Sequence, residues 1–198
     1  LSMNTNVRLD FIRNTSVPGT LSFAFPATTI QAAGLPWGTT LGDFDNDGLT
    51  DMALHNQRLT DGPAMQVFRN SSNTTSLSFG LAGTYAGGLK STGGLSSGDL
   101  NGDGKADIIA IGQTGVPDSI VVFRNTTATA GQTSFDARVN LTVQTNPTNT
   151  FICDMNGDGK ADIAVFRPTN STWYLYGIGP RVYGTVGDIP AIGDYNGD

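Results

Sequence analysis

The chain has 198 residues, 38% of them hydrophobic, and a formal net charge of −6. An acidic chain without a basic patch is a poor partner for nucleic acid. No apolar run approaches the roughly 20 residues that span a bilayer, so we expect no membrane insertion. All 17 acidic residues are aspartates, there are 26 glycines, and lysine occurs only three times. Glutamate and lysine favour helices whereas glycine and aspartate do not, so the composition predicts an all-β fold of short strands and turns.

The chain is a tandem array in which one aspartate-rich loop occurs four times. The copies begin at Asp43, Asp99, Asp154 and Asp194, which lie 56, 55 and 40 residues apart. A second marker recurs at the same spacing in Ile12-Arg13-Asn14, Phe68-Arg69-Asn70 and Phe123-Arg124-Asn125. Two markers with one spacing indicate internal repeats. We divide the array into a partial unit over 1–53 ending in loop 1, a unit over 54–109 with loop 2, a unit over 110–164 with loop 3, and a short unit over 165–198 ending in a truncated loop 4.

Short strands are expected to follow each loop. After loop 2 they are predicted at Asp107–Ile111, Ser119–Arg124, Ser134–Val143 and Thr150–Cys153, and the last one leads into loop 3. Four short antiparallel strands in roughly 40–55 residues is the size of one propeller blade. The predicted fold class is therefore all-β, made of β-propeller-type repeats of about four strands each. We expect a partial propeller that is a fragment of a larger one, a small four-bladed ring, or an open array completed by neighbouring subunits.

The loops have the residue pattern of calcium sites. In loop 1, four aspartates occupy positions 1, 3, 5 and 9, and Gly48 allows a left-handed turn. Calcium takes six to eight oxygen ligands in tolerant geometry, whereas magnesium demands near-ideal octahedra and zinc prefers His and Cys. The loop differs from an EF-hand because position 12 is apolar, where that motif has a glutamate. The alternative is that the loops are plain Asp/Asn/Gly turns.

The candidate metal ligands are the polar residues at positions 1, 3, 5 and 9 and the backbone carbonyl at position 7. They are Asp43, Asp45, Asp47, Leu49 and Asp51 in loop 1; Asp99, Asn101, Asp103, Lys105 and Asp107 in loop 2; Asp154, Asn156, Asp158, Lys160 and Asp162 in loop 3; and Asp194, Asn196 and Asp198 in loop 4. Asparagine at position 3 predicts that loops 2 and 3 bind more weakly than loop 1. Without metal, the clustered carboxylates should destabilise the fold.

The pattern Gly-Asp-x-Asp/Asn-x-Asp-Gly-x-x-Asp followed by an apolar pair resembles the FG-GAP/VCBS repeat family, whose calcium-loop blades form integrin α-subunit propellers and occur in secreted bacterial proteins. The stretch from Ile163-Ala164-Val165-Phe166 through Trp173-Tyr174 to Gly193-Asp194-Tyr195 is similar to the bacterial VCBS variety. The resemblance implies a calcium-stabilised β-propeller with a role in adhesion or cell-surface architecture. It also implies that the loop aspartates ligate Ca²⁺, in about three complete loops and a fourth truncated one.

The sequence departs from the family pattern at several positions. Cys153 stands where the other loops have a leading glycine, and Phe79-Gly80 is the only trace of the Phe-Gly landmark. The last loop lacks its closing aspartate. Family propellers close with more blades than the three and a half to four units found here. The partial units at both ends lead us to expect strand pairing with another copy, giving a larger propeller or a fibre.

The expected function is an extracellular or cell-surface, calcium-binding structural or adhesive module without catalytic activity. Its expected partners are other repeats, copies of itself, or an extracellular protein or glycan. One alternative is a carbohydrate-binding, lectin-like module, with sugar-stacking rings drawn from Trp37, Tyr85, Trp173, Tyr174 and Tyr176. Another is an accessory domain of a secreted hydrolase. His55 is the sole histidine, so we expect it to be a hydrogen-bonded structural residue, and the Ser96 motif Gly94-Leu95-Ser96-Ser97-Gly98 lacks the helix and histidine of a nucleophile elbow.

Two further features recur along the chain. Arg13, Arg69 and Arg124 occupy one repeat position, where they could pair with loop aspartates of an adjacent unit or remain solvated. Asn-x-Ser/Thr sequons make glycosylation candidates, although Asn, Ser and Thr also crowd ordinary turns. The six sequons are at Asn14, Asn70, Asn73, Asn125, Asn140 and Asn170.

Overall fold

The computed structural model describes residues 6–57, 64–86, 92–112, 119–142, 149–155, 157–167, 171–175 and 179–182. All regular elements in these ranges are β-strands, which confirms the all-β prediction. Within the same ranges no helix is long and apolar enough to cross a membrane. The strands are β1 (Asn6–Phe11), β2 (Thr28–Ala33), β3 (Leu35–Gly42), β4 (Asp51–Gln57), β5 (Ala64–Asn70), β6 (Phe79–Ala86), β7 (Thr92–Gly98), β8 (Asp107–Gly112), β9 (Ser119–Phe123), β10 (Val139–Thr142), β11 (Asn149–Cys153), β12 (Asp162–Arg167), β13 (Thr172–Leu175) and β14 (Gly179–Val182).

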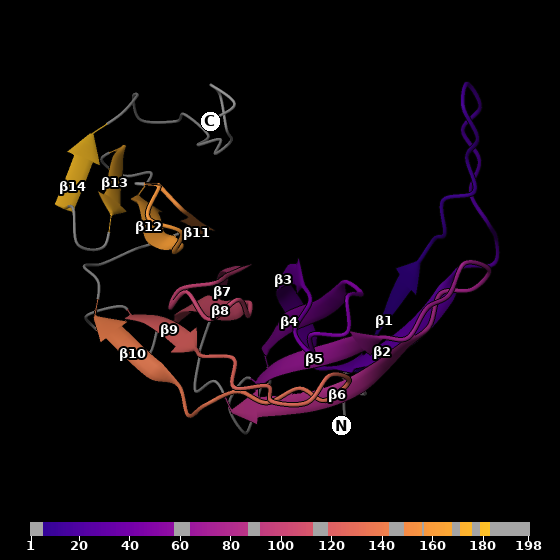
Figure 1. Ribbon diagram of the computed structural model, residues 1–198, viewed down its shortest axis with the longest axis horizontal. Coiled ribbons are helices and arrows are strands. Elements are labelled where there is room, and N and C mark those ends of the chain that lie inside the picture. The colour runs from indigo at the N-terminus through magenta and orange to yellow at the C-terminus, as the bar shows by residue number, and fades with distance from the viewer. Residues whose placement is uncertain are drawn as a thin grey trace, which may run out of the picture.

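The strands form three four-stranded antiparallel sheets and one antiparallel pair. The sheets are β3-β4-β5-β6, β7-β8-β9-β10 and β11-β12-β13-β14, and the pair is β1-β2. Each sheet is a simple meander, as expected of a propeller blade. Figure 1 shows the sheets following one another along an open arc. We call them sheets 1, 2 and 3 in chain order.

Each complete loop joins the first and second strands of its sheet. Loop 1 lies between β3 and β4, loop 2 between β7 and β8, and loop 3 between β11 and β12. The unit boundaries predicted at 53, 109 and 164 fall within strands β4, β8 and β12. The predicted units therefore have the same period as the sheets but start at a different point of it. Of the strands expected after loop 2, the one at Ser134–Val143 is shorter than predicted, because β10 begins only at Val139 and residues 124–138 form a hairpin.

The first strands of the three sheets lie side by side through polar contacts. The Ser97 hydroxyl donates to the Leu41 carbonyl oxygen at 2.8 Å, and the Ser96 hydroxyl donates to the Thr150 carbonyl oxygen at 2.6 Å. Gly98 permits this approach, because a Cβ there would lie 2.5 Å from Ile152 Cγ2. The β3, β7 and β11 strands therefore make the inner line of the arc, as first strands do in a propeller.

Three apolar clusters lie between neighbouring sheets. Alternate side chains of one strand enter different clusters: on β8, Ile108 and Ala110 pack toward sheet 1, whereas Ile109 packs toward sheet 3. On β4, Ala53 and Leu54 divide in the same way between sheet 2 and the β1-β2 pair. Sheets 1 and 2 are therefore packed on both faces, in keeping with the nearly continuous apolar sequences of their central strands.

A hairpin connects β1 with β2, and similar hairpins connect the third and fourth strands of sheets 1 and 2. The hairpins cover residues 12–27, 71–78 and 124–138. Each starts near an asparagine that pairs across the hairpin with a phenylalanine. The pairs are Asn14 with Phe23, Asn70 with Phe79, and Asn125 with Phe135.

Candidate metal centres

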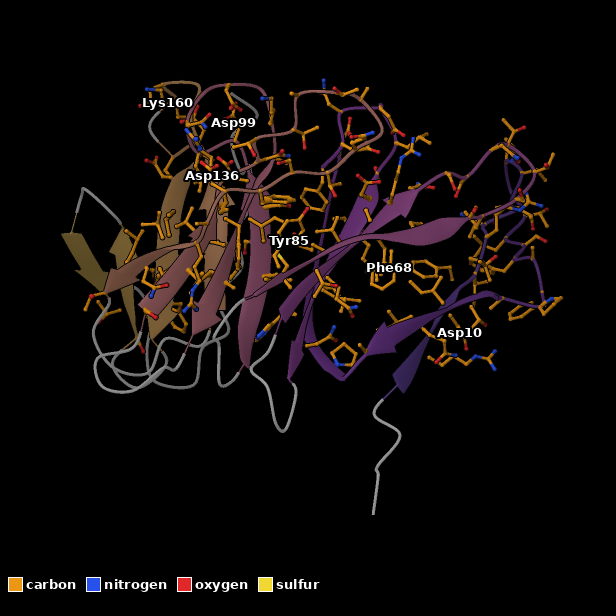
Figure 2. All side chains as sticks on the ribbon, turned by 90° about the horizontal axis from the view of Figure 1, so that it is seen from below. Asp10, Phe68, Tyr85, Asp99, Asp136 and Lys160 are labelled. Carbon is orange, nitrogen blue, oxygen red and sulfur yellow. The ribbon has the colours of Figure 1, made fainter. Side chains whose placement is uncertain are left out.

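The three complete loops lie at one edge of the array. Figure 2 shows Asp99 of loop 2 and Lys160 of loop 3 at this edge. Gly48 has a φ of 87°, which confirms the left-handed turn expected at position 6. Position 4 is also left-handed: Asn46 has a φ of 59°, and Gly102 stands there in loop 2 with a φ of 80°. This second turn was not predicted from the sequence. It could have been, because position 4 is asparagine in loop 1 and glycine in loop 2, and these residues tolerate the left-handed conformation best.

Loop 1 brings three carboxylates together. Single oxygen atoms of Asp43, Asp45 and Asp51 all lie within 4.8 Å of one another. Asp45 and Asp51 are fully buried. The Asp43 carboxylate accepts hydrogen bonds from the Asp47 amide at 3.1 Å and the Gly48 amide at 2.9 Å, so the backbone holds it over the loop. A group of carboxylate oxygens at this spacing has the donor type and density that a hard divalent cation requires.

The aspartate at position 9 also fastens the loop to its sheet. Asp51 accepts the Phe44 amide at 3.0 Å on one oxygen and the Asn70 amide at 2.7 Å on the other. Asp107 repeats this arrangement with Leu100 and Asn125, at 3.0 and 2.7 Å. Burial raises the pKa of Asp51 and the pKa of Asp107, and the backbone amides only partly oppose it. Each of these carboxylates therefore anchors its loop to the sheet through hydrogen bonds and is also a candidate metal ligand.

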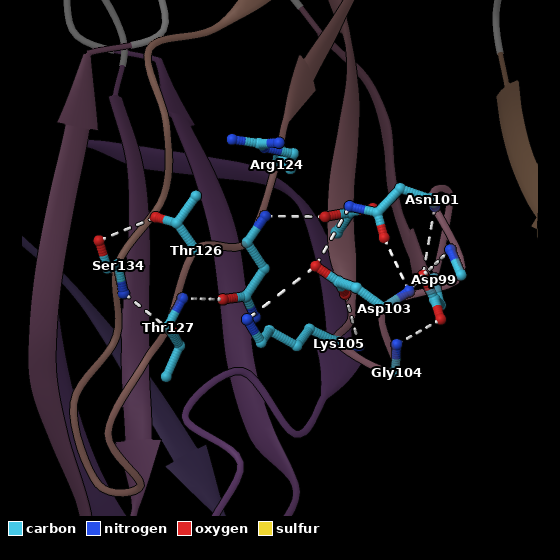
Figure 3. A network of polar contacts seen from close by, with 12 residues as sticks. Asp99, Asn101, Asp103, Gly104, Lys105, Arg124, Thr126, Thr127 and Ser134 are labelled. Carbon is cyan, nitrogen blue, oxygen red and sulfur yellow. Dashed lines mark hydrogen bonds and ion pairs between the residues drawn. The ribbon is translucent and has the colours of Figure 1, made fainter.

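Loop 2 is organised around Asp99 (Figure 3). Its carboxylate accepts the backbone amides of Gly102 and Gly104 at 2.7 Å each, and those of Asn101 and Asp103 at 3.2 Å each. Burial acts to raise the pKa of Asp99, but these amides outweigh it and lower the pKa. Position 3 is an amide here, and among the described residues only loop 1 gathers three carboxylates within reach of one ion.

In loop 3 the described residues repeat the loop 2 arrangement. Asp154 accepts the amides of Gly157 at 2.7 Å and Gly159 at 2.8 Å, and Asp162 accepts the Met155 amide at 3.1 Å. The amides at position 7 donate to the carboxylate at position 5 in every complete loop: Leu49 to Asp47, Lys105 to Asp103, and Lys160 to Asp158. The remaining candidate ligands, Asn156, Asp194, Asn196 and Asp198, lie outside the described residues.

In loop 1 an arginine contacts the carboxylates. Arg69 Nε lies 2.5 Å from an Asp45 oxygen, and Arg69 Nη2 lies 2.8 Å from an Asp47 oxygen. At the equivalent position, Arg124 pairs instead with Asp136, with Nε at 2.8 Å. Arg13 donates to the Thr74 carbonyl oxygen at 3.3 Å. One of the three repeated arginines thus pairs with loop aspartates, and that loop belongs to its own sheet.

Residues 99–165, from the start of loop 2 to β12, match the family model described as an FG-GAP-like repeat. This stretch is an FG-GAP-like repeat. The match covers one full period of the array and confirms the family predicted from the loop pattern, while the bacterial VCBS variety stays a prediction. No curated protein and no solved structure matches the chain.

The repeated sequon is a structural element in the described units. In Asn125 the side-chain amide is buried and donates to the carbonyl oxygens of Phe44 at 3.0 Å and Ala106 at 3.1 Å. In Asn70 it donates to the Thr50 carbonyl oxygen at 2.8 Å. The Asn14 carboxamide oxygen accepts the Ser16 amide at 2.8 Å. This oxygen-to-amide turn recurs in all three copies and explains the Asn-x-Ser/Thr pattern.

The remaining sequons differ in exposure. Asn73 and Asn140 are exposed, with Asn73 at the tip of its hairpin, where its side-chain oxygen accepts the Thr75 and Ser76 amides at 2.9 Å each. Asn170 lies outside the described residues. Asn14 of the repeated sequon is exposed as well, so among the described residues Asn14, Asn73 and Asn140 are the asparagines on which a glycan would meet no buried contact.

The residues considered for sugar binding or catalysis have structural surroundings. Tyr85 packs edge-on against Phe135 with ring centroids 5.0 Å apart, and Trp173 lies 5.3 Å from both Phe151 and Phe166. The Trp37 and Tyr174 side chains and Tyr176 lie outside the described part.

His55 and Ser96 belong to strands. His55 is fully buried on β4, but neither ring nitrogen has a hydrogen-bond partner among the described residues, so the expected hydrogen bond is absent from that part of the chain. Burial lowers the pKa of His55. Ser96 lies on β7, with its hydroxyl bonded to the next sheet, and the surrounding Gly94–Gly98 segment is strand. Neither residue has the arrangement of a catalytic dyad.

Proposed function

We propose that this chain is a calcium-stabilised, non-catalytic structural or adhesive module that works outside the cell. The observation that carries the proposal is the convergence of Asp43, Asp45 and Asp51 in loop 1. Three carboxylates with only oxygen donors suit calcium better than zinc, which favours nitrogen and sulfur ligands. The exposed ends of loops 2 and 3 leave room for the water ligands that calcium accepts.

The extracellular setting is supported by the low calcium affinity expected of these loops. Loops 2 and 3 supply three carboxylates and one amide each, and residues 101–104 of loop 2 and 157–160 of loop 3 are exposed. Calcium modules of the extracellular space bind with Kd values of about 10⁻⁴–10⁻³ M, which the calcium outside cells suffices to fill. A non-catalytic role is supported by the full burial of His55 and by the hydrogen bond that the Ser96 hydroxyl makes to the neighbouring sheet.

The test is a thermal melt in excess calcium, in magnesium and in chelator. A site filled at about 100 times its Kd adds about 2.7 kcal/mol to the free energy of unfolding, so calcium should raise Tm clearly and magnesium much less. Asp43→Asn should reduce the calcium-dependent rise. Asp136→Asn is the matched control, because it removes the same charge outside the loops and should leave the rise unchanged. Identical melts with calcium and chelator would refute the metal proposal.

A further inference from the structure

Every Asn-Gly pair of the chain occupies positions 3 and 4 of an acidic loop. The pairs are Asn101-Gly102 in loop 2, Asn156-Gly157 in loop 3 and Asn196-Gly197 in loop 4. Asparagine is chemically labile, because the backbone nitrogen of the next residue can attack its side-chain carbonyl carbon, and a glycine there has no side chain to hinder the attack. The pair in loop 2 lies wholly within the described residues, and both of its members are exposed.

The attacking nitrogen in loop 2 is that of Gly102, and a carboxylate already accepts its proton in a hydrogen bond. The Gly102 amide donates to Asp99 Oδ1 at 2.7 Å. A group that removes a proton must lie within about 2.6–3.2 Å of the atom that carries it, and Asp99 meets this condition. Loop 3 repeats the contact, since the Gly157 amide donates to Asp154 at 2.7 Å. Attack on Asn101 therefore has a proton acceptor in place.

The Asn101 carboxamide is held at both of its polar atoms by Asp103 (Figure 3). Asn101 Oδ1 accepts the Asp103 backbone amide at 2.9 Å, and Asn101 Nδ2 donates to the Asp103 carboxylate at 3.2 Å. Negative charge develops on Oδ1 when its carbon becomes tetrahedral, and a backbone N–H aimed at that oxygen stabilises this charge. The two contacts also fix the orientation of the carboxamide, which lowers the entropic cost of the attack.

A lysine from the neighbouring sheet lies over the same peptide. A Cβ at residue 102 would lie 3.3 Å from Lys160 Cε and 3.5 Å from Lys160 Cγ. The ammonium group is bonded to Cε, so it brings a positive charge close to the Asn101-Gly102 pair. This charge opposes the negative charge that forms during the attack. Glycine also suits position 102 because its φ is 80°.

We propose that Asn101 modifies itself, and that loop 2 promotes its conversion to aspartate or isoaspartate. The Gly102 nitrogen forms a bond to Asn101 Cγ while its proton passes to Asp99. The Cγ–Nδ2 bond then breaks, the leaving nitrogen takes up that proton, and ammonia departs from a cyclic imide. Water adds to one of the two imide carbonyls and opens the ring, which gives aspartate or isoaspartate according to the bond that breaks. No electrons are transferred.

The aspartate product would give loop 2 the carboxylates that loop 1 has, at positions 1, 3, 5 and 9. A fourth carboxylate should strengthen a site that asparagine leaves weaker. This consequence, unlike the reaction, rests on the calcium function proposed above. Asn101→Asp reproduces the product, so its calcium-dependent rise in Tm should exceed that of wild type. An equal or smaller rise would reject the consequence.

Ageing of the full chain in chelator at neutral pH, followed by peptide mass spectrometry, tests the reaction. Asn101 should convert at least about tenfold faster in the folded chain than in the same chain unfolded in urea, because unfolding separates the groups that act on it. Asn140 is the internal control: it is exposed but precedes leucine, and it should stay unconverted. A folded chain that converts Asn101 no faster than the unfolded chain would overturn the proposal.

Two variants test the groups around the peptide. Lys160→Met keeps the stem over Gly102 and removes the charge, and Asp99→Asn removes the proton acceptor. Both should lower the folded-state rate toward the rate in urea. Arg124→Met is the matched control for the lysine, because it removes a cation that pairs with Asp136 outside the loops, and it should age like wild type.

The two proposals are read separately. If Lys160→Met and Asp99→Asn both age like wild type, the loop geometry does not act on the asparagine and the proposed reaction fails. Every ageing rate is measured in chelator, so that failure leaves the calcium proposal untouched. A melt that does not respond to calcium rejects the metal proposal and leaves the reaction untouched.

Discussion

Arg69 holds Asp45 through a charge-assisted hydrogen bond across 24 residues of sequence, with Nε 2.5 Å from the carboxylate oxygen. Asp45 is fully buried, whereas the Arg69 side chain is 39% exposed. A buried carboxylate needs a compensating charge or several hydrogen-bond donors. Loop 1 has one carboxylate more than loops 2 and 3 and no lysine, so Arg69 is the resident cation that balances it.

Replacing Arg69 with methionine keeps the apolar stem and removes the charge. In chelator, Arg69→Met should lower the free energy of unfolding, by less than the full cost of breaking a buried pair because the arginine is partly exposed. Saturating calcium should recover most of the loss, so the calcium-dependent rise in Tm should be larger than in wild type. Arg124→Met is the control, since its pair with Asp136 is exposed and worth at most about 1 kcal/mol. Equal effects of the two variants would contradict this role of Arg69.

Positions 5 and 9 of loop 2 should behave differently when neutralised. Asp107 is buried and accepts hydrogen bonds from two backbone amides. In Asp107→Asn the side-chain NH₂ group would face one of these N–H donors, so the substitution should lower the free energy of unfolding by about 2–3 kcal/mol even in chelator. The Asp103 side chain is 38% exposed, so Asp103→Asn should change stability little in chelator and reduce only the gain from calcium. Urea unfolding with and without calcium measures both the stability in chelator and the additional stability that calcium gives. An Asp107→Asn chain as stable as wild type in chelator would show that position 9 does not anchor its loop to the sheet.

The buried sequon asparagine should not carry a glycan. In a host that glycosylates Asn-x-Ser/Thr, peptide mass spectrometry of the secreted chain should find Asn125 unmodified, because its amide nitrogen donates to two carbonyl oxygens. Among the described residues, Asn14, Asn73 and Asn140 are the exposed sites where modification can be accommodated. Asn125→Ala should cost about 2–4 kcal/mol, whereas Asn140→Ala should cost less than about 0.5 kcal/mol. A folded secreted chain glycosylated at Asn125 would contradict the observed hydrogen bonds.

His55 should make stability fall on acidification. Burial lowers the pKa of His55 below its ordinary value of 6.5, so the unfolded chain binds this proton more readily than the folded chain does. The contribution of the neutral ring is complete above pH 6.5 and is lost as the pH falls from there through the folded-state pKa. His55→Leu should remove this loss, so its stability relative to wild type should grow between about pH 8 and pH 5. A difference that stays constant with pH would refute the assignment.

The local features were predictable from the sequence because they depend on neighbouring residues. The loop turns follow from Gly48 and its counterparts, and β8 and β9 follow from short apolar runs. The long-range contacts were not predictable. The Asn125 side chain reaches the Phe44 carbonyl across 81 residues, and the sequon alone could not distinguish that bond from a glycan site. The three repeated arginines share a sequence position but differ in partners, because Asp136 stands beside Arg124 alone.

The apolar clusters between the sheets have a consequence for cooperativity. The side chains of β8 are divided between two clusters, so sheet 2 has no core of its own and is stabilised only through both neighbours. Such an array behaves as a one-dimensional row of nearest-neighbour couplings, in which opening starts at an end and advances one interface at a time. Amide hydrogen exchange should therefore be slowest on the central strands β4 and β8 and faster toward both ends, with no single global unfolding event setting all the rates.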